Sequence, residues 1–282
     1  PRRYGHRTAH QDLPATLLRL AAACPVEHRE ASSRLVLHAL WSSALAKDAK
    51  PTLDKADALM AAAEALDAGK PVMIEKPIAS NVEEGRAIIE AAARHGVKLM
   101  VGHVERFNPA VQAIKDAIKE EDILSIGITR VGPFPPRMSN VGVVIDLAVH
   151  DIDLIRWFTE SDIVEVQPQL SSAVAEREDI ALLQFRTASG VLAHINTNWL
   201  TPFKARNVTV ATRGKYVMGD LLTRQVTECF GFKPDGSYSM RHLPVGHDEP
   251  LRAELIAFLD AVRTGNLPAV SGDEGVASLE IA

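Results

Sequence analysis

The sequence predicts an α/β fold in which a doubly wound parallel sheet, atypical or incomplete on its N-terminal side, is followed by an α+β domain. Two short apolar runs, residues 70–76 and 97–103, predict the first part, because a helix-forming segment separates them. Runs that are apolar throughout are typical of parallel strands covered on both faces. A series of strand-like segments from residue 163 to about 230 predicts a mainly antiparallel sheet in the second part.

Helices and strands alternate in the first half, in the expected order helix 54–68, strand 70–76, helix 81–95 and strand 97–103. The first helix is rich in Ala and Leu and ends at Gly69, and the second ends at Gly96. Glycine is the residue that most often follows the last turn of a helix. Ser80 and Glu83 have the spacing of a capping box, which predicts where the second helix begins.

The second half begins with a helix signal at Asn108 and Pro109, a capping residue followed by proline in the first turn. A strand over 123–131, a Pro-rich loop to residue 140, a helix near 146–158 and a last helix over 250–264 are expected after it. Between them, residues 191–199 alternate between apolar and polar side chains, which predicts a strand with one face in the core.

The first 54 residues do not fit a doubly wound domain. Such a domain begins with a strand and a GxGxxG turn, whereas this chain has Gly5 and then no glycine before Gly69. Two interpretations remain open: an unusual helical segment, or a reading-frame error upstream of about residue 55 in an otherwise intact gene.

The amino-acid composition limits the class of protein and the partners to be expected. Charged residues make up 24% and hydrophobic residues 46% of the 282 residues, a globular balance. The formal charge of −5 favours neither nucleic acid nor an anionic membrane as a partner. No apolar run reaches membrane-spanning length, and no signal peptide is apparent. Cys24 and Cys229 lie far apart without metal-binding spacing, so a cytoplasmic location is expected.

Lys76 is the first candidate for chemistry, because it follows a predicted parallel strand at the sheet edge where ligand sites collect. Pro77 fixes the direction in which the chain leaves the strand. The ammonium could polarise a reacting hydroxyl. The alternative is that Glu75 and Lys76 are an exposed strand-end pair.

Asp146 and His150 are the second candidates. Four residues apart on a helix, they share one face, and a carboxylate beside an imidazole suits a general base. The alternatives are a helix cap and a core histidine. Asp151 and Asp153 extend the acidic cluster, but they point around the helix and no other metal signature accompanies them, so no metal site is predicted.

Arg106, Asn108 and Arg137 are the third set. Arg106 follows the second strand and could hold a phosphate or carboxylate, and Arg137 in the Pro-rich loop could do the same. Asn108 could equally be only a helix cap, and Arg137 only a surface arginine.

The motifs Glu75-Lys76-Pro77 and Asp146-x-x-x-His150 together resemble those of the glucose–fructose oxidoreductase / inositol dehydrogenase (Gfo/Idh/MocA) family. The segments VGHVERFNPA, RVGPFPPRMSNVGVVIDLAVHDIDLIRWF and GFKPDGSYSM are most similar to those of members that act on UDP-N-acetylglucosamine. The resemblance covers roughly residues 55–282. It implies an N-terminal Rossmann domain and a C-terminal domain with a large, open, mainly antiparallel sheet.

That resemblance implies hydride transfer between a sugar carbon and the nicotinamide of NAD or NADP. His150 would take the hydroxyl proton, Asp146 would orient or relay, and Lys76 would polarise the sugar oxygen. Glu75, Lys76 and Pro77 would meet the cofactor, and the third set named above would bind the nucleotide sugar. Residues 1–105 are expected to form the dinucleotide-binding domain, of which residues 1–54 are anomalous, and residues 106–282 the domain for substrate binding and homo-oligomerisation. A non-catalytic binding protein on this scaffold and a dehydrogenase of another sugar or polyol are the alternatives.

Overall fold

The computed structural model describes residues 62–135 and 141–282, and two sheets organise this part of the chain. The smaller one pairs β1 (Val72–Glu75) with β2 (Leu99–Gly102) in parallel, with α4 (Val82–His95) in the connection. Residues 62–67 are helical and precede β1. The parallel pair separated by a helix confirms the predicted α/β fold.

The start of α4 lies one residue later than the sequence motif predicts. Asn81 is the N-cap, and its side chain accepts a hydrogen bond of 2.9 Å from the backbone N–H of Glu84. The Glu84 carboxylate in turn accepts from the backbone N–H of Ser80, at 3.2 Å. Ser80–Glu83 and Asn81–Glu84 have the same spacing, so the sequence contains two overlapping capping signals. The helix uses the second one, and it ends as predicted at Gly96, in the left-handed region with φ 64°.

The larger sheet has eight strands in the order β10-β9-β8-β7-β3-β6-β5-β4. β3 and β6 pair in parallel, and the remaining neighbours pair antiparallel. The strands are β3 (Ile123–Pro133), β4 (Ile163–Ser171), β5 (Ile180–Thr187), β6 (Leu192–Asn198), β7 (Leu200–Thr212), β8 (Lys215–Asp220), β9 (Gln225–Phe230) and β10 (Ser239–Leu243). The mainly antiparallel sheet expected of the second half is therefore confirmed.

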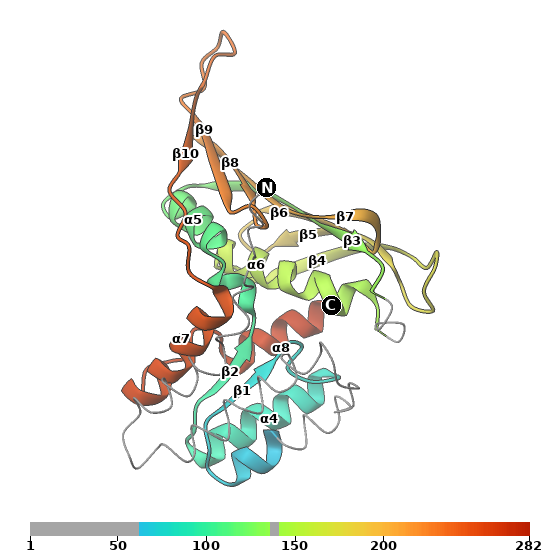
Figure 1. Ribbon diagram of the computed structural model, residues 1–282, viewed down its shortest axis with the longest axis vertical. Coiled ribbons are helices and arrows are strands. Elements are labelled where there is room, and N and C mark those ends of the chain that lie inside the picture. Colours follow the sequence, from blue (N-terminus) through green and yellow to red (C-terminus); the bar gives the residue numbers. More distant parts are fainter. Residues whose placement is uncertain (1–61, 136–140) are drawn as a thin grey trace, which may run out of the picture.

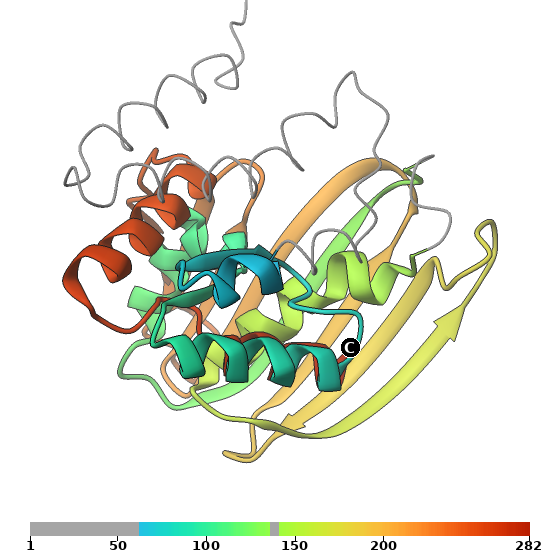
Figure 2. The same cartoon turned by 90° about the horizontal axis from the view of Figure 1, so that it is seen from below.

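In the described part of the chain, helices cover one face of the large sheet (Figure 1 and Figure 2) and none lies on the other face (Figure 1). The covering elements are η4 (Val104–Phe107), α5 (Pro109–Ile118), η5 (Val144–Ala148) and α6 (Val149–Thr159). On β6 the predicted alternation is observed: Ala193, Ile195 and Thr197 are buried against these helices. α5 begins as predicted, with Asn108 as N-cap and Pro109 in the first turn.

The chain returns to the small sheet at its end. α7 (Pro250–Thr264) and α8 (Gly272–Ile281) lie beside β1, β2 and α4 (Figure 1). Leu255 and Phe258 of α7 and Val276 of α8 belong to the same buried cluster as the strands of the small sheet. The sequence-based division placed residues 250–282 with the second half, but their apolar side chains complete the core of the first. No helix among the described residues is long and apolar enough to cross a membrane.

Candidate active site

Lys76 and Asp146 meet at the carboxyl end of β1. The Lys76 ammonium donates a hydrogen bond to the backbone carbonyl of Asp146, and its Nζ lies 3.4 Å from Oδ1 of the Asp146 carboxylate. The peptide bond to Pro77 is cis. Burial lowers the pKa of the Lys76 ammonium, while the Asp146 charge opposes that shift. The structure thus holds a largely buried cation beside one carboxylate.

Glu75 stands at the same strand end, and its side chain is exposed. It pairs in register with Gly102 of β2. A Cβ atom on Gly102 would lie 3.2 Å from both the Cα and the carboxylate carbon of Glu75, so glycine makes room for that side chain. Glu75 is the last residue of β1, and Lys76 and Pro77 follow it directly.

His150 lies in the first turn of α6, directly after the π-helical turn η5 that carries Asp146. Its Nδ1 is buried and, among the described residues, has no hydrogen-bond partner. Burial lowers the pKa of His150 well below the usual 6.5, and the positive charges of Lys76 and Arg130 add to that effect. The imidazole is therefore neutral at neutral pH and able to accept a proton.

The pairing of these three side chains differs from the sequence-based picture in one respect. An aspartate that orients a histidine would raise the imidazole pKa, whereas the Asp146 carboxylate contacts Lys76 and the pKa of His150 is lowered. Asp146 therefore influences the charge of Lys76 more directly than that of His150. π-Helical turns are rare and occur often at functional sites, and this one carries Asp146 to the end of β1.

A buried ion network supports the helix that carries His150. Arg130 on β3 binds the Asp151 carboxylate through Nε and Nη2, at 2.7 to 3.0 Å, and donates to Glu105 at 2.8 Å. Asp151 follows His150 directly and is fully buried. The network fixes the first turn of α6 against β3, and thereby the direction in which His150 points.

Arg106 and Asn108 are committed to internal contacts. The Arg106 guanidinium donates to both oxygens of Asp153 and to Glu274, each at 2.7 Å. The Asn108 amide caps α5 and donates to Glu105 at 3.2 Å. The structure therefore uses both side chains to hold elements together, which is the alternative that the sequence left open for Asn108. Arg137 lies outside the described residues.

The acidic cluster on α6 does not form a metal site. Asp151 is bound by Arg130 and Asp153 by Arg106, so each carboxylate already faces a guanidinium. Among the residues that the structure describes, no group of three or more His, Cys, Asp or Glu side chains is arranged to hold a metal ion.

Sequence reasoning missed Arg206. This residue of β7 pairs with Arg130 across the sheet, and its Nη1 donates to Glu105 at 2.9 Å. Its side chain is 34% exposed, and its charge reaches both Asp146 and His150, since it lowers the pKa of the imidazole. No local motif marks Arg206; only the antiparallel pairing of β3 with β7 brings it to the site.

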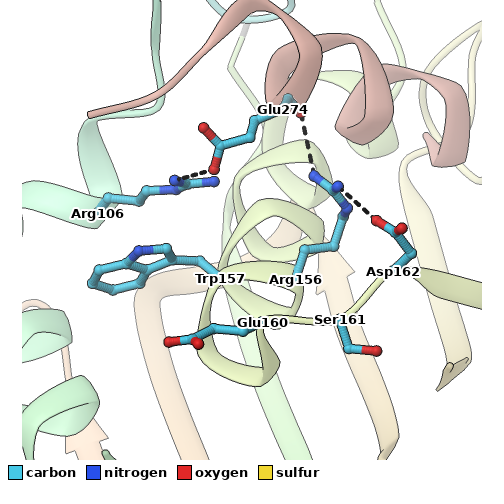
Figure 3. Close-up of a pocket in the computed structure, with 7 residues that line it drawn as sticks. All are labelled: Arg106, Arg156, Trp157, Glu160, Ser161, Asp162 and Glu274. Atoms are coloured by element: carbon cyan, nitrogen blue, oxygen red, sulfur yellow. Dashed lines mark hydrogen bonds and ion pairs between the residues drawn. The ribbon is translucent and has the colours of Figure 1, made fainter. Parts of the chain in front are cut away.

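A cavity of about 240 Å³ lies at the end of α6 (Figure 3), and neither Lys76 nor His150 lines it. Its two arginines face carboxylates: Arg106 donates to Glu274 at 2.7 Å and Arg156 to Asp162 at 2.9 Å. The cavity is lined by Arg106, Arg156, Trp157, Glu160, Ser161, Asp162 and Glu274. It marks the point where the buried network around Asp153 reaches the surface.

The described residues fit the reacting end of a nicotinamide nucleotide and an alcohol. A neutral imidazole with an unpartnered nitrogen and a buried ammonium lie at the carboxyl edge of parallel strands, where α/β sheets bind such ligands. The pyrophosphate of a dinucleotide meets the first βα turn of a doubly wound sheet. Residues 1–61, which precede β1, lie outside the described residues.

Comparisons with known proteins match two parts of the chain to one family of oxidoreductases. Residues 58–103 match the family described as "Oxidoreductase family, NAD-binding Rossmann fold", and residues 130–217 match the "GFO/IDH/MocA C-terminal domain". Inositol 2-dehydrogenase of Rubrobacter xylanophilus is 37% identical over 147 residues, which cover 48% of this chain and 42% of that protein.

UDP-N-acetylglucosamine 3-dehydrogenase of Acidithiobacillus ferrooxidans is 29% identical over 158 residues, which cover 56% of this chain and 50% of that protein. A solved structure of the same Acidithiobacillus enzyme superposes with a TM-score of 0.75 at 26% identity, covering 82% of this chain and 74% of that one. The sequence matches to these two relatives thus span half of their length or less.

Proposed function

This chain belongs to the GFO/IDH/MocA family of oxidoreductases, and from that premise we propose that it transfers a hydride between a hydroxyl carbon of a sugar or polyol and the nicotinamide of NAD or NADP. The observation that carries the proposal is the neutral His150 close to the Lys76–Asp146 pair. A purely structural domain has no need of a buried ammonium and an unpartnered imidazole at one strand edge.

In this mechanism His150 takes the proton of the substrate hydroxyl, because its imidazole is neutral at neutral pH. Lys76 donates a hydrogen bond to the same oxygen and stabilises the negative charge that develops there. Asp146 holds the lysine in place and favours its charged form. The bound nicotinamide supplies the hydride acceptor for the oxidation.

We assign the dinucleotide to the domain of residues 1–105, where Glu75, Lys76 and Pro77 would meet its nicotinamide end. We assign the substrate to the part of residues 106–282 that forms the large sheet and its covering helices. Arg206 presents a partly exposed guanidinium there, of which one nitrogen is bound to Glu105. A cation in that position favours a substrate with an anionic group, such as UDP-N-acetylglucosamine or a related nucleotide sugar. An inositol or another neutral polyol is the second candidate, because inositol dehydrogenases are among the relatives.

Ligand protection against thermal unfolding tests this proposal. We expect NAD(H) or NADP(H) to raise the melting temperature, and the accepted sugar to raise it further in the presence of the nicotinamide. UDP-N-acetylglucosamine and myo-inositol are compared separately to identify the substrate class. If no nicotinamide nucleotide shifts the melting temperature, the chain is a binding protein on this scaffold and the dehydrogenase proposal fails.

We also propose that the open face of the large sheet joins copies of this chain. Leu182, Leu192 and Tyr216 lie on β5, β6 and β8 and are 49%, 50% and 38% exposed. Apolar side chains exposed on a sheet face are typical of association surfaces. Light scattering after size exclusion should give a multiple of the 30.6 kDa chain mass for the wild type and a smaller mass for Leu182→Glu/Leu192→Glu. A monomeric wild type would contradict this.

We propose the reducing cytoplasm as the location of the protein, and the buried free thiol of Cys229 is consistent with it.

A further inference from the structure

His103 is a buried polar residue that the mechanism above does not use. It follows β2 directly and caps η4, and it is 1% exposed. Among the described residues, neither of its ring nitrogens has a hydrogen-bond partner. Burying an imidazole without a hydrogen-bond partner lowers the stability of the folded protein, so its presence at this position needs an explanation.

Two residues of α6 face this imidazole. The His150 ring lies with its centroid 6.2 Å from that of His103, and the two planes are almost perpendicular at 88°. The Nδ1 atom of His103 lies 3.8 Å from Oδ2 of Asp153. His150 and Asp153 are three residues apart and so lie on one side of the helix. His103 thus lies close to both residues on this side of the helix.

Asp153 is held in place for this arrangement. Arg106 donates to both of its oxygens at 2.7 Å, and Ser278 of α8 donates to it at 3.5 Å. A fixed carboxylate beside an imidazole stabilises its protonated form, and Asp153 acts on His103 in this way. The groups that shift the pKa of His150 include no carboxylate.

We propose that His103 is a positioning and proton-relay residue: its ring packs edge-on against the His150 imidazole and it receives the proton that His150 takes from the substrate hydroxyl. This inference rests on the proposed function, in which His150 is the base. The O–H bond of the substrate breaks and an N–H bond forms on His150. The proton on the opposite ring nitrogen then moves to His103 through one bridging water, because the two rings share no direct hydrogen bond. It stays with the His103–Asp153 pair until the product leaves and His150 meets solvent again.

The direction of this transfer follows from the charges around the two rings. Burial lowers the pKa of both, but Asp153 opposes the shift at His103, whereas His150 faces mainly positive charges. The proton is therefore more stable on His103 than on His150. The charged and titratable groups that act on His103 are Asp153, Arg106, Lys76 and Glu274, with His150 facing its ring.

Nuclear magnetic resonance of the protein labelled with ¹⁵N-histidine tests the contact without any turnover. His103→Gln and His103→Phe are compared with the wild type, and His103→Phe keeps an aromatic ring without acid–base capacity. We expect the His150 ring nitrogens to shift in both variants. His242→Gln is the matched control: that residue lies on β10 and bonds Thr227 at 3.0 Å. Unchanged His150 resonances in folded His103 variants would overturn the proposal.

Measurements of enzymatic turnover are the second part of the test. With the sugar or polyol that the wild type oxidises, His103→Gln and His103→Phe should lower kcat by about 10- to 100-fold, leave KM and nicotinamide affinity within about twofold, and change the pH profile. His242→Gln should leave all of these unchanged. An unaltered kcat and pH profile in a His103 variant with a wild-type melting curve would overturn the relay. An inactive wild type would remove the proposed function instead, and the resonance measurement would then decide the His103–His150 contact by itself.

Discussion

Replacing Arg130 by methionine should destabilise the protein strongly. The guanidinium is 2% exposed and is the sole cation bonded to the fully buried Asp151 among the described residues. Glu105, the other carboxylate on Arg130, also accepts hydrogen bonds from Arg206 and Asn108. Removing one partner from a buried ion pair costs about 3–5 kcal/mol, because the remaining charge stays desolvated. Against a typical free energy of unfolding of about 5–15 kcal/mol, that loss is about a fifth or more.

The same reasoning predicts a partial rescue. Arg130→Met/Asp151→Leu removes the uncompensated carboxylate together with its partner, and buried pairs replaced by apolar side chains are often neutral or stabilising. Urea unfolding followed by circular dichroism gives the free energies of wild type, single variant and double variant. The double variant should be at least about 1 kcal/mol more stable than the single one.

The pH dependence of Arg130→Met provides an internal check. Burial already raises the pKa of Asp151 in the wild type, although Arg130 opposes this shift. Without the guanidinium the pKa should rise further, so the folded variant binds a proton that the unfolded chain releases above about pH 4. The difference in free energy of unfolding between wild type and Arg130→Met should therefore become smaller as the pH falls. A cost below about 1 kcal/mol, or a double variant no more stable than the single one, would refute the view that this network anchors α6.

Two further outcomes follow from the charges of single residues. The pKa of Glu254 is raised from 4.5 to about 9 by burial and by the nearby charges of Glu75 and Glu249, so the folded state keeps a proton that the unfolded chain loses. Glu254→Gln should thus gain stability over wild type by about 1.4 kcal/mol per pH unit between about pH 6 and pH 8, measured by urea unfolding; a difference independent of pH would contradict this. Arg206→Gln should raise KM for a nucleotide sugar about tenfold or more with little change for a neutral polyol, whereas the exposed Arg213→Gln should change neither; equal effects on both substrates would remove Arg206 from anion binding.

Short sequence motifs predicted the helices and strands whose limits depend on residues close to one another in the chain. The apolar run that ends at Glu75 became β1, the Asn108–Pro109 pair begins α5, and Gly265 ends α7 in the left-handed region with φ 77°. Each of these depends on residues within a few positions of one another. The start of α4 was misplaced by one residue, because two overlapping motifs of equal quality precede that helix.

Contacts between distant segments were beyond the reach of these signals. Arg106 resembled an anion ligand, but its partners Asp153 and Glu274 lie 47 and 168 residues further along the chain. The place of Arg206 depends on the pairing of β7 with β3, and the place of α7 and α8 depends on which core their apolar faces complete. The family resemblance implied that Lys76 and Asp146 belong to one active site, and the structure brings the two side chains together.

The reduction of NAD and NADP by the purified chain, followed through the near-ultraviolet absorbance of the reduced nicotinamide, tests the central claim most directly. The substrates are UDP-N-acetylglucosamine and a set of inositols and neutral sugars, and the chains are wild type, Lys76→Met and His150→Asn. We expect one substrate class to be oxidised by the wild type, and both variants to lose at least about 100-fold in kcat with smaller changes in KM. Wild-type turnover that either folded variant retains in full would contradict the assignment of Lys76 and His150 to the reaction.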